Sequence, residues 1–189
     1  WRNAPVYLPK NGRSGAESGR IESMSAKAPA YTRSAFFSDI TRYLRTELPG
    51  ELRDFQVRQT PFLMKLYYQN ERVHFEVWVD SLRQQIEIGL DFEDGPESTS
   101  AYLAFFDERI VEIKQATGPV LELERWTKTW GHFVEVYPID PLTSERAIMI
   151  AERMATIISV LQPLVEEANV EAGERPTYSK PYWTRRRKR

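Results

Sequence analysis

The sequence contains no cysteine, only two histidines, and only nine glycines. Without cysteine the chain has no disulfide framework, no thiol nucleophile and no thiolate ligand. Two histidines are too few for a zinc site built mainly of imidazole, so no metal ligand is assigned and no cofactor is expected. The glycines form no phosphate-binding loop, and no nucleophile elbow or Ser/His/Asp set stands out. These absences exclude the enzyme classes with the clearest sequence signatures.

Long apolar runs are also missing. No uninterrupted run approaches the ~20 residues of a membrane-spanning helix, and the first residues lack the apolar core of a signal peptide. We therefore expect a cytoplasmic protein with no membrane partner. Its composition, 41% hydrophobic and 28% charged, is typical of a globular chain, and 189 residues suit one domain.

The net charge of −1 conceals an uneven distribution of charge along the chain. Residues 1–33 hold six basic and two acidic residues, whereas residues 34–174 hold 13 basic and 25 acidic ones. Residues 175–189 hold seven basic residues and no acidic one. Such asymmetry usually concerns partners rather than the fold. We divide the chain into a flexible basic arm (1–32), an α+β domain (33–170) and a basic aromatic tail (171–189). Met24 has the surroundings of a native start, which would make residues 1–23 a non-native extension.

Two segments with strict alternation organise the domain. Apolar residues occupy every second position from Val73 to Val79 and again from Ile86 to Phe92. Because successive side chains of a strand point to opposite sides, each segment predicts a half-buried strand, and the short polar link between them predicts a hairpin.

The remaining elements cover this hairpin. Helical spacing predicts helices from Thr32 or Ser34 to Leu48, from Ser98–Ser100 to Gly118, and from Asp140 onward, with Pro163 kinking the last helix or starting its frayed end. Further strands are expected at residues 55–58, 62–68, 120–126 and 132–137. The predicted fold class is α+β, with a single antiparallel sheet of about five or six strands and three helices packed mainly on one face.

The polar face of the hairpin holds the weak catalytic candidates Glu76, Glu87, Asp91 and His74, with Trp78 beside them. Carboxylates on adjacent strands can share a metal ion or divide acid and base roles. A tight turn would set Glu76 opposite Glu87, whereas a looser turn would set His74 opposite Asp91. The alternative is an ordinary solvated face whose carboxylates pair with Lys65, Arg72 or Arg83.

The tail is the clearest functional signal in the sequence. Basic side chains pair with phosphates and aromatic rings stack on bases, so the tail is a candidate for binding nucleic acid or an acidic protein partner. It could also be a solvated tail, or fold back on the acidic body of the protein. The candidate residues are Arg175, Tyr178, Lys180, Tyr182, Trp183, Arg185, Arg186, Arg187, Lys188 and Arg189.

Two weaker patterns complete the set. Trp126, Trp130, His132 and Tyr137 could line a ligand cleft or an interface, or simply pack between helix and sheet. The triplet Glu112-Ile113-Lys114 resembles the metal-binding core of restriction-endonuclease-like nucleases, where such a triplet lies on a strand. Here it falls on a predicted helix, which is the wrong context.

The sequence therefore favours a non-enzymatic binding or accessory protein whose basic tail engages nucleic acid or an acidic protein. The first alternative is a carboxylate-based enzyme, hydrolase or nuclease-like and metal-dependent or not, with its site on the polar face of the 72–92 hairpin. The second is a subunit that forms a homodimer within a larger assembly.

Overall fold

The computed structural model describes residues 31–139 and 141–171. Within them, six antiparallel strands form one sheet in the order β1-β2-β3-β4-β6-β5. Four strands follow each other along the chain as hairpins, and the sheet then continues with a pair from later in the sequence. The strands are β1 (Gln56–Gln59), β2 (Leu63–Tyr67), β3 (Val73–Asp80), β4 (Gln85–Phe92), β5 (Glu122–Glu124) and β6 (Gly131–Pro138).

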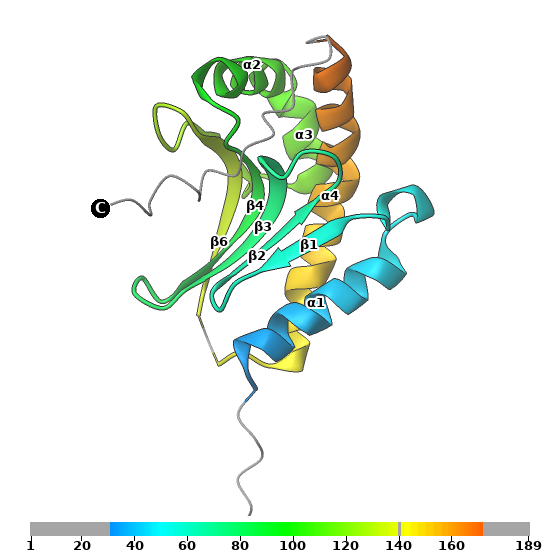
Figure 1. Cartoon of the computed structure of the whole chain (residues 1–189), viewed down its shortest axis with the longest axis vertical. Coiled ribbons are helices and arrows are strands. Elements are labelled where there is room, and N and C mark those ends of the chain that lie inside the picture. Colours follow the sequence, from blue (N-terminus) through cyan, green and yellow to red (C-terminus); the bar gives the residue numbers. More distant parts are fainter. Residues whose placement is uncertain (1–30, 140, 172–189) are drawn as a thin grey trace, which may run out of the picture. The chain divides into compact units, whose positions relative to one another are not determined.

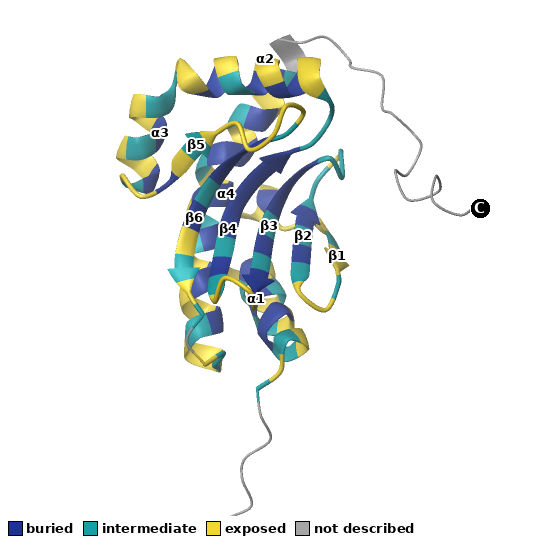
Figure 2. Cartoon of the chain, turned by 90° about the vertical axis from the view of Figure 1, so that its left-hand side faces the viewer, coloured by how far each residue is buried: buried dark blue, intermediate teal, exposed yellow. Residues whose placement is uncertain are grey.

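Helices cover one face of this sheet, and no helix of the described residues lies over the central part of the other, open face (Figure 1). Figure 2 looks onto the open face, with α1 and α4 behind the strands. Helix α2 contacts β4 and β5, and α3 packs on α4. The helices are α1 (Arg33–Glu47), α2 (Pro96–Asp107), α3 (Ile110–Thr117) and α4 (Ser144–Glu171), with a short 3-10 turn at Gly50–Leu52. The α+β prediction with a single antiparallel sheet is confirmed, with four helices in the described residues instead of three.

The core lies between the helices and the inner face of the sheet. Helix α1 starts at the Thr32 cap, whose hydroxyl accepts a hydrogen bond from the Ala35 N–H at 3.1 Å. Its apolar stripe and that of α4 pack against the alternating apolar residues of β3 and β4. At one end of the core, Phe106 packs edge-on against Phe133 at a ring distance of 5.0 Å. This arrangement commits the other side chains of β3 and β4 to the open face.

Two helix predictions need correction. The helix expected from Ser98 to Gly118 is two helices, because the chain turns at Arg109, whose backbone leaves the helical region (φ −113°, ψ 7°). The turn lets both Phe106 and Ile113 reach the core. The helix expected from Asp140 begins at Ser144, and it does not fray at Pro163 but continues to Glu171, since Val165 and Ala168 are buried and hold its last turns.

Helix α4 is long and apolar enough to cross a membrane by length and composition alone, over Ser144–Asn169. Core helices of globular proteins meet the same criterion. Here the residues that make α4 apolar include Ile150, Met154, Ile157 and Leu161, which are all buried against the rest of the fold. Its composition is therefore accounted for by packing within the domain.

Candidate functional site

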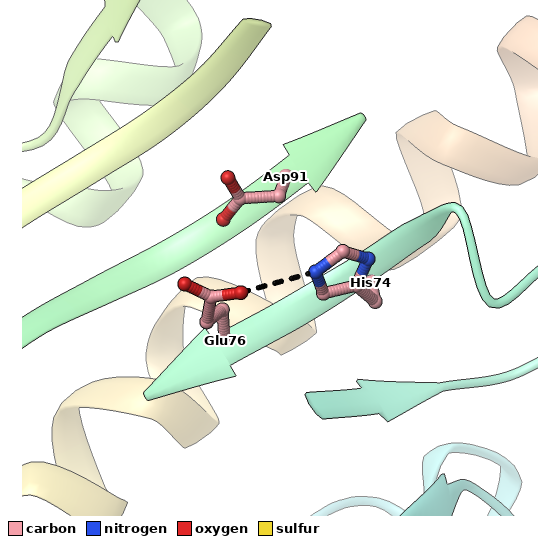
Figure 3. A group of neighbouring side chains, drawn as sticks. All are labelled: His74, Glu76 and Asp91. Atoms are coloured by element: carbon pink, nitrogen blue, oxygen red, sulfur yellow. Dashed lines mark hydrogen bonds and ion pairs between the residues drawn. The ribbon is translucent and has the colours of Figure 1, made fainter. Parts of the chain in front are cut away.

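Three side chains of metal-ligating type converge on the open face of the sheet (Figure 3). His74 and Glu76 come from β3, and Asp91 comes from β4, directly opposite His74. The alternation of β3 and β4 sends all three side chains to the same face. One potential ligand atom from each residue lies within 4.8 Å of the others. The Nε2 atom of His74 is 3.3 Å from Oε2 of Glu76. Strands β3 and β4 therefore pair in the register expected for the looser turn, which sets His74 opposite Asp91.

A small hollow beside this cluster results from a glycine. Gly89 lies opposite Glu76 on β3 and Val134 on β6, so no side chain fills the middle of that row. The hollow has a volume of about 10 Å³, and its walls include Glu76, Asp91 and the ring of Trp126. This volume corresponds to about one water molecule or a single ion. The hollow is too small for an organic substrate.

Burial has a strong effect on the charge of Asp91. Its removal from solvent, together with the nearby negative charge of Glu76, raises the pKa of Asp91 to about 6. His132 and His74 act in the opposite direction. Glu76 is itself approached by the Nζ atom of Lys65 at 3.9 Å. The cluster therefore holds two carboxylates close to each other. A neighbouring cation would stabilise their charged forms.

His132 on β6 bridges the cluster to the edge of the sheet. Its Nδ1 atom is 3.6 Å from Oδ1 of Asp91, and its Nε2 atom is 3.0 Å from Oε1 of Glu124. Burial lowers the pKa of His132, but the interactions with Asp91 and Glu124 outweigh it and raise the pKa to about 8. Trp126 stacks on the imidazole at a ring distance of 5.5 Å, which favours the protonated ring.

This raised pKa predicts a loss of stability in mildly alkaline solution. A group whose folded pKa lies above its usual 6.5 contributes stability that is complete below that value and lost as pH rises through about 8. For His132 the difference corresponds to about 2 kcal/mol. We expect the free energy of unfolding, measured by urea titration with a chelator present, to fall by most of that amount between pH 6.5 and 9.

The control is His132→Asn, which keeps a polar side chain but does not titrate in this range. The variant should be less stable at pH 6.5 and show a much flatter pH profile. An unchanged decline in the variant would show that another group is responsible.

The structure brings some predicted residues together and separates others. Glu87 lies one row from the cluster, opposite Trp78, and pairs with Arg83 at 3.4 Å. The ring centroids of Trp126 and Trp130 are 5.7 Å apart, and Trp126 stacks on His132. Tyr137 belongs to the helix-covered face, and its hydroxyl donates a hydrogen bond to Glu135. The Nε atom of Arg72 lies 3.9 Å from Oδ1 of Asp94.

Two further predictions concern residues outside the metal-ligating cluster. The triplet Glu112-Ile113-Lys114 lies on α3, so its context is helical, as expected. The tail candidates from Arg175 to Arg189 are outside the described residues, and binding of nucleic acid or of an acidic protein through them stays a prediction.

The contact between His132 and Asp91 was not predicted from the sequence. The signal that could have found this contact is the strand predicted at residues 132–137, in which His132 and Val134 lie on one face. Only the pairing of β6 with β4 brings that face beside Asp91. The sequence matches no protein-family model and no curated protein, so the function has to be inferred from the geometry of the site.

Proposed function

We propose that the protein binds a divalent transition-metal ion on the open face of its sheet, through His74, Glu76 and Asp91. The proposal is carried by the convergence of one imidazole and two carboxylates within 4.8 Å. This set of nitrogen and oxygen ligands suits zinc or manganese. A bound cation would also offset the repulsion between the two carboxylates.

Three protein ligands leave a coordination position for water, as in catalytic zinc sites. The hollow next to Glu76 and Asp91 provides space for such a water molecule. A bound metal ion would lower the pKa of that water and supply a nucleophile for hydrolysis. The proposal therefore corresponds to the metal-dependent alternative from the sequence and is compatible with partner binding by the tail.

The experiment is calorimetric titration of the full chain with Zn²⁺ and with Mn²⁺. We expect one ion per chain and an affinity that falls at least ~100-fold in Asp91→Asn and in Glu76→Gln, since changes in outer-shell residues alone typically cost 10–100-fold. His74→Ala should have a similar effect.

Glu87→Gln is the matched control, because it neutralises a carboxylate on the same face that lies outside the cluster. Its affinity should remain within about twofold of the unmodified chain. The proposal fails if Glu76→Gln and Glu87→Gln weaken binding equally, or if neither ion binds.

A further inference from the structure

A second concave surface lies on the helical side of the described domain, far in sequence from the metal-ligating cluster. It is a groove of about 600 Å³ lined by residues of α3 and α4. Apolar side chains of Ile113, Val160 and Leu164 form much of its lining. Its volume is within the range of small-ligand pockets, ~300–1,000 Å³, so it can hold a short peptide segment rather than an ion.

The groove includes a backbone acceptor without its usual helical donor. Pro163 lies inside α4 and has no N–H. The carbonyl of Ser159, four residues earlier, therefore cannot receive the hydrogen bond that a helix normally supplies. Both Ser159 and Pro163 line the groove. A donor side chain entering the groove could use this carbonyl.

The surroundings of the groove are acidic. Glu112 lines the groove, and Glu108 and Glu167 lie beside it, because each contacts the lining residue Arg109. The side chain of Glu108 is 78% exposed and that of Glu167 is 47% exposed. Arg109 offsets part of this charge through its contacts with Glu108 at 3.7 Å and with Glu167 at 3.0 Å. The chemistry fits a segment that is both aromatic and basic.

We propose that this groove binds the chain's own segment 178–183, with the basic residues 185–189 against its acidic surroundings. Residues 175–189 combine Tyr178, Tyr182 and Trp183 with seven basic residues and no acidic one. Charge and apolar character are thus complementary to the groove.

The length of the connecting chain supports the assignment. Ser159 to Leu164 lie between seven and twelve positions before the last described residue of α4, Glu171. This corresponds to ~10–18 Å along the helix axis. Residues 172–177 span up to ~20 Å when extended. They include Gly173 and Pro176, residue types that favour a reversal of the chain. Tyr178 can therefore reach the level of the groove after such a reversal.

The absence of cysteine allows a direct test in the full chain. We expect Ser159→Cys combined with Ser179→Cys to form an intramolecular disulfide under mild oxidation, because docking would hold the two thiols near each other. The matched control is Ala101→Cys combined with Ser179→Cys. Ala101 is exposed, and its neighbour Tyr102 donates to Asn169 near the end of α4, so the tail can reach it as well.

If the tail docks in the groove, the disulfide should form at least ~10 times faster in the groove pair than in the control pair. Docking also predicts that 1 M salt, or Glu108→Lys with Glu112→Lys, removes most of this advantage. Equal rates in the two pairs would overturn the proposal. Disulfides formed mainly between two molecules would also overturn it, because the occupant would then be the tail of a second copy. Neither outcome depends on metal binding.

Discussion

Replacement of Arg153 by Met should destabilise the protein by about 3–5 kcal/mol, the cost of leaving a buried charge without its partner. Glu135 lies on the helix-covered face of β6 and is only 3% exposed. The Nε atom of Arg153 on α4 donates to its two carboxylate oxygens at 3.0 and 2.8 Å. Tyr137 donates to the same carboxylate at 2.7 Å. Urea unfolding at pH 7 measures the loss.

Two further variants make this test specific. Arg42→Met removes an exposed arginine that pairs with Asp39 on the surface, and should cost less than ~1 kcal/mol. The double variant Glu135→Leu with Arg153→Met should recover most of the stability, because an apolar pair of similar size needs no counter-charge. If Arg153→Met costs no more than Arg42→Met, the buried ion pair does not contribute as proposed.

Gly89→Ala should destabilise the protein by about 3 kcal/mol, since an added methyl group has no space there. A Cβ atom at this position would lie 1.8 Å from the carbonyl oxygen of Phe133 and 2.7 Å from its carbon. Both atoms belong to the backbone of β6, which pairs with β4 over its whole length. The two central strands would have to separate locally to accept the methyl group.

Gly50→Ala is the matched control for this substitution. A Cβ atom at Gly50 has no neighbour within 4 Å, so the change should alter the free energy of unfolding by no more than ~0.5 kcal/mol. If both variants lose a similar amount of unfolding free energy, the backbone near Phe133 can move to accept the methyl group, and the prediction is wrong.

Alternation made the central hairpin predictable, because a period of two separates the two faces of a strand without knowledge of its neighbours. The same logic placed His74, Glu76 and Asp91 on one polar face. It left open whether they meet, since the register depends on the length of the turn. In the structure the turn is the looser one, and His74 lies opposite Asp91.

Features that depend on distant segments were not predictable. In the strand from Gly131 to Pro138, a simple rule of apolar residues inside and polar residues outside would place Glu135 in solvent. The structure shows the reverse, with Glu135 buried and Val136 55% exposed. Arg153 makes this possible, and it lies on a helix whose position only the complete fold determines. The break at Arg109 has a similar origin, since helical spacing continues through it.

The outer strands of the sheet influence how molecules of this protein meet one another. At one border lies β1, four residues long, in which three of the four residues are exposed. At the opposite border lies β5, three residues long, with Glu122 and Glu124 exposed. Short borders with charged side chains discourage the addition of further strands from neighbouring molecules. The sheet can therefore end in two edge strands without an inherent tendency to grow into fibres.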